Sequence, residues 1–273
     1  MSNVQTKPNF DTTLFEGAPH YYARYRPKYP VVLYDKLITE LNLNGEGRLL
    51  DLGCGTGLIA LALRDRFEQI IGLDPDPEML KEAKQEADQV NAHNITWLEQ
   101  SAEQIDERLG TFKLITIGRA FHWMDRALVL NRSYDLLEPS GGFVLLATGG
   151  EDPWKSDTPW QKQALTVIKK WLGDKRRAGQ GWWADPQPPH AELLSQSLFP
   201  SQILYEVTYE KIWTVDSFIG YLYSTAFCLR SFLGDQIEAF EAELRETLLA
   251  IDPSGQFPKT MSASALVARK QQI

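Results

Sequence analysis

The sequence predicts an α/β protein whose mostly parallel sheet is covered by helices on both faces. Through the first half of the chain, short apolar runs that read as strands alternate with segments whose apolar residues recur at helical spacing. A strand, a helix and a second strand in succession make the two strands parallel, because the helix carries the chain back across the sheet. The chain has 273 residues, enough to bury one such core. We therefore expect a single domain over residues 1–273.

A glycine turn after the first strand organises this prediction. Residues 48–57 read Arg-Leu-Leu-Asp-Leu-Gly-Cys-Gly-Thr-Gly, and helical spacing follows over 58–67. The three glycines, Gly53, Gly55 and Gly57, let the backbone turn sharply and let a ligand approach closely, with a helix N-terminus just beyond. Such a turn suits a nucleotide-like ligand.

Charge indicates which nucleotide the turn binds. Asp51, at the end of the strand, repels a pyrophosphate but attracts a cationic ligand. Leu58 stands where a dinucleotide fingerprint has its third glycine, so the spacing disfavours NAD, which remains a rival. Asp74 ends the next strand, where a carboxylate is placed to accept both ribose hydroxyls.

Four motifs occur in a fixed order over about a hundred residues: Asp51–Gly57, Gly72–Asp74 followed by Met79-Leu80, Ala120–Asp125, and Leu137–Gly142. On these motifs the chain resembles the class I S-adenosylmethionine-dependent methyltransferases, within them the small-molecule group that includes the ubiquinone/menaquinone and trans-aconitate methyltransferases. The resemblance implies a Rossmann-like sheet of seven strands with the last strand antiparallel, and S-adenosyl-L-methionine as cofactor.

The predicted cofactor site combines these motifs with an aromatic N-terminal segment over residues 15–30. In the resembled family a similar segment lies over the cofactor, and its aromatic faces would stabilise a sulfonium; alternatively, the aromatics only pack on the domain. The family usually has an acidic residue where Ser101 stands, so the adenine contact departs from its pattern. The expected cofactor-binding residues are Tyr22, Arg26, Asp51, Gly53, Gly55, Gly57, Asp74, Pro75, Met79, Ser101, Ala102, Glu103, Arg119 and Ala120.

The cofactor half is expected to span residues 44–147, preceded by a cover and a helix over 1–43. Asn44-Gly45 closes that first helix. Asp76, Pro77 and Glu78 are the N-cap, the first-turn proline and a first-turn acidic residue of the helix expected from residue 77. The expected helices are 31–43, 58–67, 77–91 and 126–137. The first expected strand ends at Leu52, and the next four span 69–74, 95–98, 112–118 and 142–147.

A cap is expected over residues 148–200, followed by C-terminal strands and helices over 201–273. Five of the eight tryptophans fall in the cap, with a helix over 159–172 and a Gly/Pro-rich loop over 173–189. Long loops in compact domains tend to be lids or binding loops, although each tryptophan can equally be core of the cap. Beyond it we expect strands over 201–213 and 264–269 and helices over 215–225 and 234–251.

His122 is the candidate catalytic base, because its ordinary pKa suits proton removal and it follows the fourth strand. That role applies to a hydroxyl acceptor. A carboxylate acceptor needs no base, and arginines would orient it. In the alternative interpretation His122 and Trp123 form the pocket floor. The expected substrate-binding residues are Tyr25, His122, Trp123, Trp182 and Trp183; the four scattered histidines make no metal site.

The predicted function is methyl transfer to an oxygen or carbon of a small molecule, with a carboxylate or a hydroxyl as the candidate acceptor group. The alternatives are a cofactor-binding protein without transferase activity and a non-methylating use of the cofactor. A net charge of −8 disfavours nucleic acid. Two cysteines, no signal-peptide core and no apolar run of membrane-spanning length predict a cytoplasmic protein with no membrane partner, a monomer or homodimer.

Overall fold

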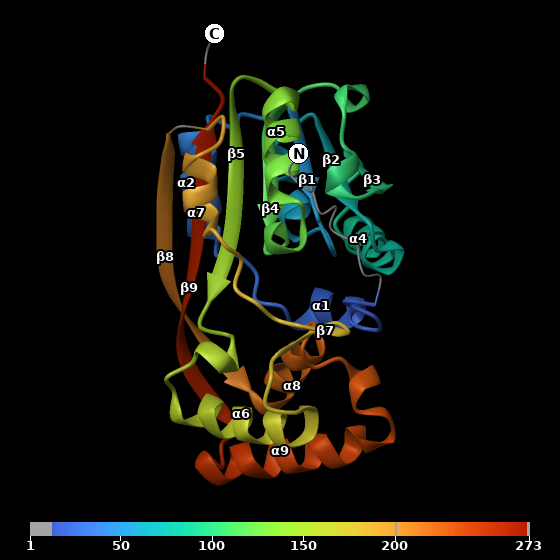
Figure 1. The fold of residues 1–273 in the computed structure, drawn as a ribbon, viewed down its shortest axis with the longest axis vertical. Helices are drawn as coiled ribbons and strands as arrows, with labels where there is room; N and C mark the ends of the chain where they lie inside the picture. Colours follow the sequence, from blue (N-terminus) through green and yellow to red (C-terminus); the bar gives the residue numbers. More distant parts are fainter. Residues whose placement is uncertain (1–12, 200, 272–273) are drawn as a thin grey trace, which may run out of the picture.

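The computed structural model describes residues 13–199 and 201–271, and its centre is one seven-stranded sheet (Figure 1). The strand order is β3-β2-β1-β4-β5-β9-β8. Neighbours among β1 to β5 pair in parallel, whereas β9 pairs antiparallel with both β5 and β8. This confirms the predicted sheet. The strands are β1 (Arg48–Leu52), β2 (Gln69–Asp74), β3 (Ile95–Glu99), β4 (Phe112–Gly118), β5 (Leu137–Gly149), β8 (Gln202–Thr214) and β9 (Gln256–Arg269).

Helices cover the sheet on both faces because successive buried residues of the central strands point to opposite sides. Leu49 and Leu114 belong to one buried cluster, with α2 and α3 residues, while Leu50 and Ile115 belong to another, with α5 and α7 residues. The helices are α2 (Val31–Glu40), α3 (Leu58–Ala62), α4 (Pro77–Gln89), α5 (Arg126–Leu136) and α7 (His190–Ser195).

A separate helical layer lies beyond the carboxyl ends of the parallel strands, at the bottom of Figure 1. It consists of α6 (Pro159–Leu172), α8 (Val215–Tyr223) and α9 (Ile237–Ile251), which share one buried cluster. Trp160 packs against Phe218 and Phe257 with ring centroids 4.9 and 5.1 Å away. Helix α1 (Pro19–Tyr25) lies between this layer and the sheet and packs on α8. The layer thus combines a helix that precedes β8 in sequence with two helices that follow it.

Several elements differ from the sequence prediction. The helix expected over 58–67 is α helical only to Ala62 and continues as a 3₁₀ turn. Strand β9 begins at Gln256, well before residue 264: its first half buries Phe257, Met261 and Ala263, but Pro258 and the wide spacing of these apolar residues hide the alternation in the sequence. A hairpin of β6 (Arg177–Ala178) and β7 (Gly181–Trp182) replaces part of the expected loop, and α7 follows it.

Residues 1–12 of the expected N-terminal cover lie outside the described residues. Among the residues that the structure describes, no helix combines the length and apolarity needed to cross a bilayer.

Candidate functional site

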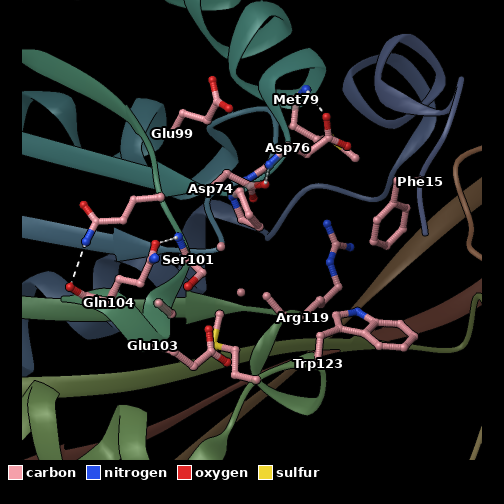
Figure 2. Close-up of a pocket in the computed structure, with 18 of the residues that line it drawn as sticks. Phe15, Asp74, Asp76, Met79, Glu99, Ser101, Glu103, Gln104, Arg119 and Trp123 are labelled. Atoms are coloured by element: carbon pink, nitrogen blue, oxygen red, sulfur yellow. Dashed lines mark hydrogen bonds between the residues drawn. The ribbon is translucent and has the colours of Figure 1, made fainter. Parts of the chain in front are cut away.

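A cavity of about 590 Å³ opens at the carboxyl ends of β1 to β4, beneath the N-terminal segment. In Figure 2 the acidic residues Asp74, Asp76 and Glu99 lie on one side of this cavity, with Arg119, Phe15 and Trp123 toward the other. Ligands of open α/β sheets bind at this edge. Of the predicted site residues, those that line the cavity are Tyr22, Gly53, Gly55, Asp74, Pro75, Met79, Ser101, Ala102, Glu103, Arg119, Ala120 and Trp123.

Asp74 is held in place by the backbone of the glycine turn. Gly55 N donates to its Oδ2 at 2.8 Å, and Asp76 N donates to its Oδ1 at 2.9 Å. A carboxylate oxygen has two lone pairs, so each oxygen can still accept one hydrogen bond from a ligand. Burial raises the pKa of Asp74 to about 6. The side chain is therefore a fixed, desolvated acceptor that faces the cavity.

Gly57 does not line the cavity; the Trp97 ring fills the space beside it. An added Cβ at Gly57 would lie 2.6 Å from the indole, and φ at this residue is +81°. Gly53 is restricted for another reason, because a Cβ there would lie 2.7 Å from the Ala120 Cβ. Only Gly55 has open space, with the Tyr22 ring 3.9 Å away. Close ligand approach is therefore a property of Gly55, and Gly57 provides packing and the turn.

Asp51 lies behind the turn and does not line the main cavity. Its side chain is buried, and Thr116 Oγ1 donates to its Oδ1 at 2.8 Å. Burial raises its pKa to about 7. About half of the Asp51 carboxyls are therefore neutral at pH 7, and the attraction for a cationic ligand is weaker than the sequence predicts.

The turn after β3 is joined to the start of α5. Gln104 Oε1 accepts from Ser101 N at 3.3 Å, and Glu103 Oε1 accepts from Asp125 N at 2.8 Å. Asp125 in turn caps α5 by accepting from Leu128 N at 3.2 Å. These bonds fix the wall where the sequence predicted the adenine contact.

Arg119 is the only lysine or arginine among the described residues that line the cavity. Its φ of +55° turns the chain just after β4. Its Nη1 donates to Pro27 O at 3.0 Å and to Thr148 Oγ1 at 3.1 Å. Its guanidinium carbon lies 5.7 Å from the centre of the Tyr22 ring. The cavity therefore has an acidic wall and, opposite it, one fixed cation.

Several predicted substrate residues lie outside the cavity wall. The Tyr25 ring packs on Gly220 of α8, where an added Cβ would lie 2.3 Å away. The His122 ring contacts those of Trp123 and Trp183, with centroids 4.5 and 4.9 Å away. Trp182 is 55% exposed. The structure thus brings Trp123, His122 and Trp183 together beside the cavity but leaves Trp182 on the surface.

The sequence analysis missed several lining residues. Phe15 was within the aromatic segment, and Leu128 lies in the first turn of α5. The others lie at or just after strand ends, so their position there was the available signal. The missed residues are Phe15, Asp76, Glu99, Gln100, Gln104, Gly118, Met124, Asp125 and Leu128. Of the predicted cofactor residues, Arg26, Asp51 and Gly57 do not line the cavity.

Comparison with known proteins shows similarity to methyltransferases. Residues 49–141 match a family model described as a methyltransferase domain. The chain is 32% identical over 136 residues to demethylmenaquinone methyltransferase of Lactiplantibacillus plantarum, a match that covers 48% of this chain and 57% of that enzyme. It is 25% identical over 217 residues to an uncharacterised methyltransferase of Mycobacterium tuberculosis, covering 80% of this chain and 78% of that protein.

The solved structures extend the similarity to the whole fold. The YcgJ protein of Bacillus subtilis superimposes with a TM-score of 0.53 at 18% identity, covering 89% of this chain and 100% of that one. Several matches to curated relatives span only about half of the relative's length. The residues matched by the family model, 49–141, include nearly all of β1 and the whole of β2, β3 and β4, whose ends build the cavity.

Proposed function

The chain belongs to the class I S-adenosylmethionine-dependent methyltransferases, and from this premise we propose that it transfers a methyl group from S-adenosylmethionine to an oxygen or carbon atom of a small molecule. The observation that carries the proposal is the cavity at the strand ends, in which Asp74 is fixed by the glycine turn. The cofactor supplies an activated methyl group. The protein's task is then mainly to bind and align the two partners.

We assign the acidic side of the cavity to the adenosyl group. Asp74 keeps one free acceptor position on each oxygen, which suits two ribose hydroxyls. The turn of Ser101, Ala102 and Glu103 offers backbone and side-chain polar groups to the adenine ring. Gly55 leaves room for close approach of the ligand to the backbone.

Arg119 suits the carboxylate at the amino-acid end of the cofactor. It lines the cavity opposite Asp74, is half-buried, and lies with its guanidinium carbon 5.7 Å from the Tyr22 ring centre and 5.2 Å from that of Tyr29. An arginine in a water-poor pocket binds a carboxylate more strongly than an exposed one does. The cofactor's positive sulfur would then lie between the acidic wall and this carboxylate.

For the acceptor side we infer that His122 supports the wall. Its ring packs on Trp123 and Trp183 outside the cavity lining, and Trp123 presents its ring to the cavity. An acceptor that already carries a negative oxygen needs no base. For a hydroxyl acceptor, His122 is again the candidate base.

Calorimetric titration with S-adenosylmethionine, S-adenosylhomocysteine and NAD, in parallel, tests the proposal. We expect micromolar affinity for the two adenosyl ligands and none for NAD. Binding of NAD alone would overturn the cofactor assignment. Binding of the adenosyl ligands without methylation of any acceptor in a broad panel of carboxylates and phenols would favour a binding protein or a non-methylating enzyme.

A further inference from the structure

Thr148, near the end of β5, joins Arg119 of the cofactor cavity to Glu151. Arg119 Nη1 donates to Thr148 Oγ1 at 3.1 Å, and Thr148 Oγ1 donates to Glu151 Oε1 at 2.5 Å. A hydroxyl has one proton and two lone pairs. Because Glu151 accepts the proton, the Thr148 oxygen presents only its lone pairs to Arg119. The direction of the bond between Arg119 and Thr148 is therefore fixed.

Glu151 is itself held by the helical layer. It is buried, and Gln161 Nε2 of α6 donates to Gly150 O at 3.1 Å and to Glu151 O at 3.2 Å. Gln161 Oε1 accepts from Ser156 Oγ at 2.5 Å and from Thr158 Oγ1 at 2.8 Å. With partners on both its oxygen and its nitrogen, the amide of Gln161 is fixed in one orientation. It therefore fixes the turn that follows β5, and with it the place of Glu151.

The Arg119 guanidinium is held through one of its three nitrogens. Pro27 O accepts from the same Nη1 at 3.0 Å, so both protons of that nitrogen are used. Arg119 Nε is buried, and no described residue accepts from it. A guanidinium presents its donors in one rigid plane, so a fixed Nη1 also fixes the direction of the others. Thr148 and Pro27 therefore determine how Arg119 faces the cavity that it lines.

Glu151 acts on Arg119 across the Thr148 hydroxyl and not through an ion pair. Among the described residues, no carboxylate lies within ion-pair distance of the Arg119 guanidinium. Burial acts to lower the pKa of Arg119, whereas two tyrosines and Glu151 act to raise it, and the net effect is a raised pKa. The guanidinium therefore stays charged, and its remaining donors can bind a carboxylate of the ligand.

The backbone around this relay does not depend on the hydroxyl. Arg119 N donates to Leu146 O at 3.0 Å, and Thr148 lies opposite Ala263 in the ladder between β5 and β9. Loss of the Thr148 hydroxyl should therefore leave the path of the chain unchanged. It should free the Arg119 side chain, which would keep only Pro27 as a described acceptor for Nη1.

We propose that Thr148 is a positioning residue of the cofactor site, which holds Arg119 in the orientation that binds the carboxylate of the cofactor. This assignment deepens the proposed function and rests on it, since it takes Arg119 as the partner of that carboxylate. It also connects the helical layer to cofactor recognition, because Gln161 of α6 holds the Glu151 that accepts the Thr148 proton.

The test is calorimetry on the full-length protein with two ligands, S-adenosylhomocysteine and its decarboxylated analogue, which keeps the amine. We expect Thr148→Val to weaken S-adenosylhomocysteine by at least about fourfold, because the long Arg119 side chain must then be ordered on binding. The affinity for the decarboxylated analogue should change by less than about twofold, because that ligand makes no use of Arg119. A purely structural role for Thr148 would weaken both ligands equally.

Two variants serve as controls. Thr148→Ser keeps the hydroxyl and should keep the affinity for S-adenosylhomocysteine within about twofold. Thr260→Val is the matched control, because the Thr260 hydroxyl of β9 also donates to a glutamate, Glu210, at 2.7 Å, but Thr260 is exposed and does not line the cavity. It should leave both affinities within about twofold.

A second variant covers the case in which Thr148→Val fails to fold. Thr148→Ala removes the hydroxyl and adds no atom, so it makes no new contact, and we expect the same selective loss of at least about fourfold. Thermal unfolding of every variant, measured alongside, separates lost binding from lost structure.

The outcomes distinguish the two proposals. If the wild-type protein does not bind S-adenosylhomocysteine, the proposed function fails. If it binds both ligands equally well, Arg119 does not bind the carboxylate, and the role of Thr148 is overturned while the cofactor assignment stands. If it prefers S-adenosylhomocysteine, three results overturn the role of Thr148: a loss smaller than fourfold in the Val and Ala variants, equal weakening of both ligands, or the same loss in Thr148→Ser.

Discussion

The cofactor half and the helical layer are each completed by an aromatic ring packed on a glycine, but the two contacts differ in how the chain brings them together. Trp97 of β3 covers Gly57 in the turn after β1, and only one strand, β2, separates β1 from β3 along the chain. Tyr25 of α1 covers Gly220 of α8, near the opposite end of the chain. The first region is thus assembled from local units and the second from distant segments.

The largest expected effect concerns these two glycines. Gly57→Ala should lower the free energy of unfolding by about 2 to 5 kcal/mol, since a left-handed residue costs about 1–2 and the clash with Trp97 about 1–3. Gly220→Ala has only the clash with Tyr25, of about 1–3 kcal/mol, offset by about 1 kcal/mol from the better helix propensity of alanine, and should cost about 0–2 kcal/mol. Chemical denaturation measures both.

Gly45→Ala is the control for backbone strain alone. Its φ is +95°, but no described atom lies within 4 Å of the added Cβ. If Gly57→Ala costs no more than Gly45→Ala, the Trp97 contact does not distinguish the cofactor half.

The next effect sharpens the comparison at the acidic wall. Asp74→Ala should weaken S-adenosylhomocysteine binding by more than about tenfold, because it removes charged acceptors as well as the anchor of Gly55. Arg26→Gln, at the end of α1 and outside the cavity lining, should leave this affinity within about twofold. Calorimetry gives both values, and an unchanged affinity in Asp74→Ala would remove the ribose assignment.

A dependence on pH separates ligand binding from stability. Burial raises the pKa of Asp74 to about 6, so affinity for S-adenosylhomocysteine should rise about tenfold from pH 5 to pH 7 as the ionised acceptor forms. Stability of the free protein should change in the opposite direction. Asp51 and Asp74 hold protons when folded, with pKa values of about 7 and 6, that they release when unfolded, with pKa values near 3.8.

The free energy of unfolding should therefore fall as the pH rises from about 4 to 7. Chemical denaturation at several pH values measures this change. In Asp51→Asn we expect a smaller slope of unfolding free energy against pH. An affinity that stays flat between pH 5 and pH 7 would show that ionised Asp74 is not the acceptor.

The smallest effect is expected at His122. His122→Phe keeps a ring against Trp123 and Trp183, so turnover of a carboxylate acceptor should stay within about threefold of the wild-type rate, whereas loss of a general base costs about 10²- to 10⁴-fold. Steady-state rates with any acceptor found in the panel decide. A loss of 100-fold or more would restore His122 as the base.

The difference between the two regions also explains what could be predicted. The sequence predicted that Asp74, Ser101 and Arg119 lie at the cavity, because parallel strands place the residues at and after their ends at one edge of the sheet. The sheet itself was predicted for the same reason. Position after a strand does not say which neighbour fills the space beside a backbone atom, so Gly57 was assigned to the cofactor although Trp97 occupies that side.

The contacts of the helical layer were harder to predict, because they join residues that are far apart in the sequence. Nothing near Tyr25 in sequence indicates Gly220, and nothing near Arg230 indicates Tyr21, to which its Nη1 donates at 3.0 Å across 209 positions. The tryptophans looked alike in sequence, yet Trp160 is buried while Trp182 is 55% exposed. Composition identified this region as aromatic but could not assign each ring.

The helices of that layer enter the chain at only two places, α6 between β5 and β8, and α8 with α9 between β8 and β9. Both places belong to the three strands at one side of the sheet, whereas Asp74 and the glycine turn belong to strands β1 and β2. Insertions, deletions and point changes can therefore accumulate in the layer during evolution while the strands that carry the cofactor motifs stay intact. The architecture allows one lineage to exchange its helical layer without rebuilding its nucleotide site.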